Sequence, residues 1–135
     1  AARTPAIEQC VIISAPYSLV DVLAIWSRGF MKLSKKIEDR IFAELLAMNG
    51  VPVHHWTVGL HSKHIGVPTL VIHDEDDPVV DLSHLSRIAD AFASSSTKVT
   101  KGFGHIKILS NKDVLQEAAD FVSMKTELTL GEAIA

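Results

Sequence analysis

This sequence of 135 residues lacks the features that mark several specialised classes of protein. Cys10 is the only cysteine, so no internal disulfide can form, and a lone thiol within an apolar run indicates a reducing, cytoplasmic setting. Thirteen Lys and Arg against sixteen Asp and Glu give a formal charge of −3, which argues against a nucleic-acid partner. No apolar run reaches the ~18–20 residues that a membrane span needs, and no signal peptide is recognisable.

Apolar residues occur instead in short runs that alternate with helical periodicity. Residues Ile7 to Ser14 form a β-branched run, and Leu70 to His73 form a second. Both runs predict strands that are buried on both faces, as in a parallel sheet. A more polar stretch, Thr97 to Lys101, predicts a third strand nearer the edge of that sheet.

The segment between the first two strands has the spacing of an amphipathic helix. Its apolar residues recur every three or four positions: Trp26, Phe30, Leu33, Ile37, Ile41, Leu45 and Met48. Gly29 and Ser34 are expected to divide this stretch into two helices, with Ser34 as the N-cap of the second. Asn49-Gly50 is a typical helix stop.

Two further helices are expected after the second and third strands. The first carries Leu82, Leu85, Ile88 and Phe92 on one face. The second begins near Ser110, which stands three residues before Asp113 as in a capping box. Its apolar face consists of Val114, Leu115, Ala118, Phe121 and Val122.

The resulting order is strand, long helical insertion, strand, helix, strand, helix. Such alternation predicts an α/β protein with a small parallel sheet and flanking helices. We expect residues 1–16 and 68–135 to form the core and residues 17–67 to form a helical insertion. This insertion is far longer than the ~10–15 residues of a crossover helix, which favours a cap or lid over a site.

Polar residues follow two of the predicted strands at the point where each strand ends. The second strand leads into Asp74-Glu75-Asp76-Asp77-Pro78, and the third leads into Gly102-Phe103-Gly104-His105. Neighbouring parallel strands lie about 4.8 Å apart and end at the same edge of a sheet, where ligands bind. A carboxylate and an imidazole could therefore form a hydrogen bond there, which would make the imidazole a better general base.

These two stretches resemble the C-terminal half of the α/β-hydrolase superfamily. The family has a strand, an acid in Gly-x-x-Asp-x-x-Val, a helix, a strand and Gly-x-Gly-His; here His73-Asp74 stands in place of the usual His-Gly. The resemblance implies that Asp77 and His105 are the acid and the base of a Ser-His-Asp triad. It also implies a partial α/β-hydrolase fold and a serine hydrolase of small ester or amide substrates with no cofactor. Trp26 and Phe30 of the cap would then line the substrate pocket.

The sequence departs from this family in one decisive respect. The nucleophile should stand in Gly-x-Ser-x-Gly ahead of the acid and the histidine, and this motif is absent. Ser14 lacks the flanking glycines, and Ile13-Ser14-Ala15-Pro16 resembles the end of the strand after the nucleophile helix. Ala1-Ala2-Arg3 looks like the tail of that helix. We therefore predict a truncated fragment without the nucleophile half, inactive as an esterase when alone.

Each of these residues also has a plainer interpretation. Asp77 could cap the following helix from the surface, and His105 could be an ordinary core or turn histidine. Trp26 and Phe30 could simply pack the cap onto the sheet. The histidine pair His61-x-x-His64 could bind zinc, but no cysteine or glutamate accompanies it, so we predict exposed histidines and no metal.

Two other functions remain open from the sequence. Asp74 and Asp76 resemble the Asp-x-Asp of haloacid-dehalogenase phosphatases, which attack phosphorus with the first carboxylate. A non-catalytic interaction module is the other alternative. An isolated half-sheet would expose the strand that contains Gln9–Ile13, and such an edge could pair two copies into a homodimer.

Overall fold

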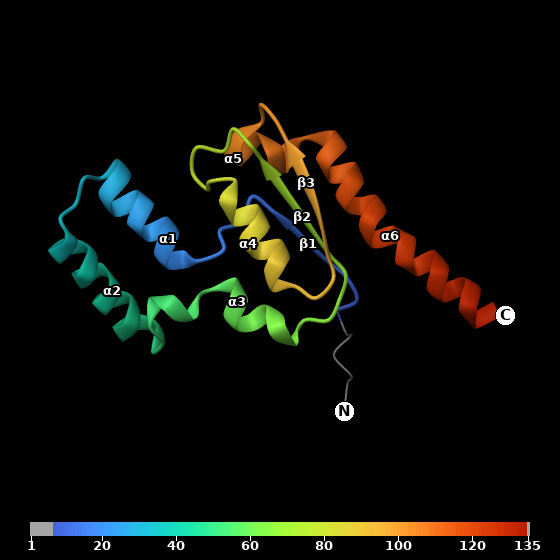
Figure 1. The fold of residues 1–135 in the computed structure, drawn as a ribbon, viewed down its shortest axis with the longest axis horizontal. Helices are drawn as coiled ribbons and strands as arrows, with labels where there is room; N and C mark the ends of the chain where they lie inside the picture. Colours follow the sequence, from blue (N-terminus) through green and yellow to red (C-terminus); the bar gives the residue numbers. More distant parts are fainter. Residues whose placement is uncertain (1–6, 135) are drawn as a thin grey trace.

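The chain folds around a three-stranded parallel sheet that has helices on both faces (Figure 1). The computed structural model describes residues 7–134, and the side chains of residues 7–124. The strands are β1 (Cys10–Ile13), β2 (Thr69–Asp74) and β3 (Ser95–Thr100), in the spatial order β1-β2-β3. Both pairings are parallel, which confirms the predicted α/β class with a small parallel sheet.

The hydrophobic core lies on the two faces of β2, all of whose residues are buried. Leu70 and Ile72 point to one face, where they pack with Ile108 and Val114. On the other face Val71 packs with a cluster from the following helix: Leu85, Ile88 and Phe92. Because alternate residues of a strand face opposite sides, a strand with apolar residues at successive positions fits only between two layers.

Two helices provide these layers, α4 (Ser83–Ala91) and α6 (Lys112–Ile134). The chain reaches α6 from β3 through the short helix α5 (Gly104–Lys107) and the 3₁₀ turn η4 (Ile108–Ser110). The expected start of α6 was displaced by one residue. Asn111, not Ser110, caps the helix, since its Oδ1 accepts the N–H groups of residues 113 and 114 at 3.0 Å.

The insertion between β1 and β2 is helical, as the spacing predicts. Its elements are α1 (Leu19–Ala24), the π-helical turn η1 (Ile25–Phe30), α2 (Lys35–Asn49), η2 (Val53–His55), α3 (Val58–His61) and η3 (Ser62–His64). The predicted division into two helices, with Ser34 at the N-cap position of the second, is confirmed; the break follows Phe30, however, and Gly29 lies inside η1. The predicted stop is confirmed: Gly50 ends α2 at φ 71°, and its N–H donates to the carbonyl of Leu46 at 2.8 Å.

The expected apolar stripe of this insertion does not form a core. Ile37 and Met48 are exposed, and the one buried residue of α2 is Glu38. The Glu38 carboxylate accepts hydrogen bonds from Ser27 Oγ at 2.6 Å and Arg28 Nε at 3.0 Å, so a polar contact joins α2 to η1. In Figure 1, α1 and α2 lie to one side of the sheet and α6 lies to the other.

Strand β1 is shorter and less buried than the sequence suggests. It begins at Cys10, three residues after the exposed Ile7, and all four of its residues are only half-buried. The reason is its position, since among the described residues β1 pairs with β2 alone. The expected helix tail at Ala1-Ala2-Arg3 lies outside the described residues. Within the described part of the chain, no helix has the length and hydrophobicity to cross a membrane.

Candidate functional site

Asp77 and His105 meet where β2 and β3 end. Asp77 lies in the turn after β2, and His105 lies in the first turn of α5, which follows β3. The Oδ2 of Asp77 lies 2.9 Å from the Nδ1 of His105. The Asp77 side chain is fully buried, whereas 27% of the His105 side chain is exposed. The structure thus brings together the two residues that the sequence analysis paired, with the imidazole on the solvent side.

The turn after β2 directs the Asp77 carboxylate towards the histidine. Its Oδ1 accepts the N–H groups of Val79 at 2.8 Å and Val80 at 2.9 Å, which leaves Oδ2 for His105. Helix α4 begins at residue 83 and takes its side-chain cap from Asp81, whose Oδ1 accepts the N–H of Ser83. The plainer interpretation of Asp77 as the cap of that helix is therefore wrong.

These contacts keep Asp77 ionised in spite of its burial. Burial alone raises the pKa of a carboxyl group, because it disfavours the charged form. Hydrogen bonds from the Val80 N–H, the His105 ring and the Val79 N–H outweigh this effect and hold the pKa of Asp77 below its ordinary value. An ionised carboxylate at 2.9 Å accepts the Nδ1–H of His105, which leaves the Nε2 lone pair free.

His73, at the end of β2, is a site residue that the sequence analysis did not identify. Its buried ring donates the Nε2–H to the carbonyl of Val80 at 2.9 Å, and Nε2 lies 3.6 Å from Asp77 Oδ2. His73 therefore braces the same turn that holds Asp77. A histidine directly after the apolar residues 70–72 of a fully buried strand is the signal that could have identified it.

Asp74 and Asp76 join the acid turn to the histidine turn. Both oxygens of the buried Asp74 accept two hydrogen bonds each, from Gly104 N–H, Asp76 N–H, Thr100 Oγ and Phe103 N–H. The Oδ2 of Asp76 accepts the N–H of Gly102 at 3.0 Å. A carboxylate this fully occupied is poorly placed to attack phosphorus, so the geometry argues against a phosphatase that uses Asp74 and Asp76.

The turn that carries His105 depends on glycine. Gly102 has φ 84° and Gly104 has φ 61°, both in the left-handed region that L side chains rarely adopt. A Cβ at Gly104 would lie 3.6 Å from the carbonyl oxygen of Asp76 and 3.8 Å from Pro78 Cδ. The two turns therefore pass close to each other immediately before the histidine.

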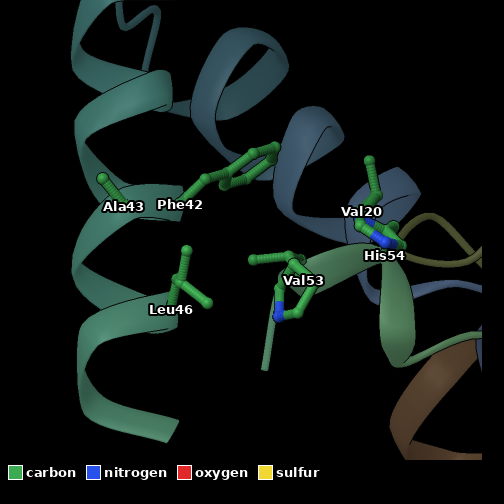
Figure 2. A pocket seen from close by; sticks show the side chains of 7 residues that line it. Val20, Phe42, Ala43, Leu46, Val53 and His54 are labelled. Atoms are coloured by element: carbon green, nitrogen blue, oxygen red, sulfur yellow. The ribbon is translucent and has the colours of Figure 1, made fainter. Parts of the chain in front are cut away.

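A hollow of about 400 Å³ opens beside the pair. It is lined by Asp76, Pro78, Val79 and residues 102–107, so His105 forms part of its wall. Figure 2 shows a separate hollow of similar volume within the insertion, between Phe42, Leu46 and Val53. Trp26 and Phe30, the predicted pocket residues, line neither hollow.

The histidines of the insertion are exposed, as predicted. The Nε2 of His61 hydrogen-bonds the carbonyl of His55 at 2.9 Å, and the two rings contact edge-on. Among the described residues, no group of three His, Cys, Asp or Glu side chains lies close enough to hold a metal ion. The thiol of Cys10 is half-buried, and burial raises its pKa, which disfavours the reactive thiolate.

Comparison with known proteins supports the fold rather than a close relationship. The sequence matches no protein-family model and no curated protein. In structure it is similar to the Mycobacterium tuberculosis protein Rv0554, with a TM-score of 0.52 and 14% identity over 91% of this chain and 57% of that one. Two weaker likenesses are to BpoC of M. tuberculosis, a candidate non-heme bromoperoxidase, and to the esterase PF2001 of Pyrococcus furiosus.

These two likenesses have TM-scores of 0.49 and 0.47 and identities of 13% and 18%. They cover 91% and 84% of this chain but 58% and 42% of the neighbours. This chain therefore spans less than two thirds of each of these three neighbours. The three-stranded parallel sheet with its flanking helices is part of an α/β-hydrolase fold.

Proposed function

We propose that this chain supplies the acid and the histidine of a Ser-His-Asp triad in a serine hydrolase that cleaves ester or amide bonds. The observation that carries the proposal is the 2.9 Å contact between the buried carboxylate of Asp77 and Nδ1 of the half-exposed His105. A partial α/β-hydrolase fold in which the two residues follow neighbouring strands supports it.

In this mechanism the carboxylate fixes the imidazole as a base. The Nδ1–H of His105 donates to Asp77 Oδ2, so the Nε2 lone pair faces outward to accept the proton of an attacking hydroxyl. The same nitrogen then returns the proton to the leaving group. Asp77 stabilises the imidazolium that forms between these steps, and the hydrogen bonds to its Oδ1 hold it in place meanwhile.

The nucleophile in this proposal comes from outside these 135 residues. The sequence has no Gly-x-Ser-x-Gly, and the chain spans only 57% of the length of Rv0554. Of the serines near the sheet, Ser14 is buried at the end of β1, with φ 47° and no hydrogen-bond partner for its hydroxyl among the described residues. A buried hydroxyl of this kind is inaccessible to a substrate.

Substrate selection is assigned in this proposal to the insertion, as a cap of residues 17–67. Trp26 and Phe30 lie one turn apart in η1, with ring centroids 5.3 Å apart and exposures of 45% and 57%. Short π-helical turns are frequent at functional sites, and this one presents two aromatic rings outward. We assign these rings to the apolar wall that receives the acyl or alkyl part of the substrate.

Hydrolysis of p-nitrophenyl esters tests the proposal. We expect no turnover by the 135-residue chain and measurable turnover by a longer natural polypeptide that includes an elbow serine. In that polypeptide Asp77→Asn should lower kcat about 10⁴-fold, as expected when the imidazole takes the wrong tautomer. Asp90→Asn, which makes the same change at an exposed carboxylate of α4, is the matched control and should leave kcat unchanged.

Turnover by the 135-residue chain alone, abolished by His105→Ala, would show that the nucleophile lies within these residues. Turnover by the longer polypeptide that is insensitive to both Asp77→Asn and His105→Ala would refute the triad itself.

A second candidate function, a non-catalytic module that pairs with a second copy of itself, is favoured by a difference between the two sheet edges. Strand β3 is polar and exposed and carries Lys98, features that protect an edge. Strand β1 has the sequence Cys-Val-Ile-Ile with no charge, which is typical of a strand with a neighbour on each side. An unprotected edge of this kind favours pairing between two chains.

Light scattering over a range of concentrations tests this alternative. The N–H groups of Cys10 and Ser14 donate towards β2, so by alternation that of Val11 faces the open edge. Self-association through β1 should therefore be weakened by Val11→Pro, which removes that donor. A wild-type chain that stays monomeric at high concentration would refute this candidate function.

A further inference from the structure

We propose that Asp74 is a positioning residue for His105: its carboxylate holds the histidine turn against the acid turn, so that Nδ1 stays on Asp77. The catalytic meaning of this role rests on the proposed hydrolase function, but the positioning itself does not require turnover to be observed. The sequence motif that pairs Asp77 with His105 does not predict this role for Asp74.

The contacts of Asp74 connect the two turns directly. Oδ1 accepts the N–H of Gly104 at 3.0 Å and the N–H of Asp76 at 3.1 Å. Oδ2 accepts Thr100 Oγ at 2.8 Å and the N–H of Phe103 at 3.2 Å. One side chain therefore holds the end of β3, the two residues that precede His105, and the turn that leads to Asp77.

The position of these contacts explains why they act on the imidazole. Phe103 and Gly104 are the two residues immediately before His105, and Gly104 has a positive φ of 61°. Their two N–H groups fix the direction in which the chain enters α5. A hydrogen bond weakens steeply as the angle between donor, hydrogen and acceptor decreases. A small rotation of this turn would therefore disrupt the 2.9 Å contact of His105 with Asp77.

The chemistry of the partners requires a carboxylate rather than an amide. All four groups around Asp74 donate, and a carboxylate is an acceptor on both oxygens. An asparagine would place an NH₂ group against two of these donors in a site where Asp74 is fully buried. The hydrogen bonds also outweigh the effect of burial and hold the pKa of Asp74 below its ordinary value, so the acceptor form persists at neutral pH.

The neighbouring Asp76 provides a matched control. It belongs to the same turn and also bonds the histidine turn, but through a single contact to the N–H of Gly102 at the exposed surface. Asp74→Asn and Asp76→Asn make the same chemical change two residues apart. The proposal predicts that only the first of these changes disturbs His105.

The test is NMR of the ¹⁵N-labelled 135-residue chain without substrate. In the wild type we expect a hydrogen-bonded Nδ1–H resonance from His105. In Asp74→Asn, exchange with water should be at least tenfold faster for this proton and for the amides of Phe103 and Gly104. In Asp76→Asn, all three rates should stay within twofold of the wild type.

A control for general destabilisation is Ile88→Val, which truncates a core side chain on the face of the sheet opposite the cluster that contacts Phe103. It should lower the Tm without changing exchange at the His105 Nδ1–H. If Asp74→Asn does not fold, Thr100→Val replaces it, because this change removes one donor to Oδ2 and keeps the side-chain shape. Its effect on the exchange rates should be smaller but in the same direction.

Folded Asp74→Asn with Nδ1–H exchange within twofold of the wild type would overturn the proposal and leave the Asp77–His105 pair intact. Absence of a bonded Nδ1–H in the wild type would instead count against the pair itself, and so against the proposed function. The two failures are therefore distinguishable in one set of spectra.

Discussion

The sheet and the insertion of residues 17–67 bury their side chains in opposite ways. In β2 every residue is buried, and Ile88 and Ile108, which pack on its two faces, have no exposed surface. In α2 the apolar side chains are at least partly exposed, while the one buried residue is the charged Glu38. The sheet thus has a closed core of its own, whereas the insertion is held by a few polar contacts and by short helices packed on one another.

This difference separates the stability of the molecule from the substrate selection that we propose for the insertion. Burial of apolar area is the main favourable term in folding, so the free energy of unfolding is concentrated in the sheet and its two helical layers. The residues that we assign to the substrate wall, Trp26 and Phe30, lie in the part that contributes least. The acid and the histidine lie at the edge of the part that contributes most.

Truncating one isoleucine in each region is the strongest test of this difference in packing between the sheet and the insertion. Ile72→Ala should lower the free energy of unfolding by about 2–5 kcal/mol, because it leaves a cavity in a closed core. Ile37→Ala in α2, where the residue is 48% exposed, should cost about 0.5 kcal/mol or less. Urea unfolding measures both, and equal losses would show that the insertion is as tightly packed as the sheet.

Low pH is expected to have the next largest effect, because it should destabilise the turns that hold Asp77 and His105. The folded pKa values of Asp74 and Asp77 lie below the ordinary value of about 3.9. Their contribution is therefore complete above the unfolded pKa and is lost as the pH falls through the lower folded values. Urea unfolding at pH 5 and at pH 3 should show this loss between the two values, below the range in which the buried His84 also affects stability. In Asp74→Asn this loss should be smaller.

Two glycines with positive φ, Gly104 beside the sheet and Gly50 in the insertion, provide a further test of the difference between these regions. Gly104→Ala should lower the free energy of unfolding by about 1–2 kcal/mol, the usual cost of a left-handed L residue, and should reduce hydrogen-exchange protection throughout the sheet. Gly50→Ala imposes the same strain at the end of α2 with open space around it. There we expect faster amide exchange within α2 only, whereas a loss of sheet protection would contradict the comparison.

The two helix starts give the smallest effect. Asn111→Ala should cost about 1 kcal/mol, because Asn111 Oδ1 accepts two N–H groups at the start of α6. Ser34→Ala should cost less than about 0.5 kcal/mol, since the Ser34 side chain makes no capping bond at the start of α2. Thermal unfolding should show a larger loss of Tm for Asn111→Ala than for Ser34→Ala. The reverse order would contradict this assignment of caps.

The sheet and the pairing of Asp77 with His105 could be predicted because they follow from local rules. Apolar runs between turn residues indicate buried strands, and parallel strands end at one edge, so residues that follow two neighbouring strands must come close. The same reasoning could not identify His73 or the role of Asp74. Their importance depends on which backbone groups the folded turns bring towards them.

The insertion was predicted less well for a related reason. Spacing of three and four indicates a helical face but not what covers it, and here the face of Ile37 and Met48 is left exposed. The π-helical turn that includes Gly29 also has no simple sequence signal. At Ser110 and Asn111 two residues suited to capping are adjacent, and only the path of the chain selects the second.

The bonds between the acid turn and the histidine turn join residues 26 to 30 positions apart. Closing a loop of that length has an entropic cost that must be met before any of these bonds can form. The parallel pairing of β2 with β3 closes the same loop, so we expect the strand pairing and the Asp77–His105 contact to form together and late in folding. A bonded imidazole proton at His105 is for this reason a marker of the fully folded sheet, absent from any collapsed intermediate in which the two strands remain apart.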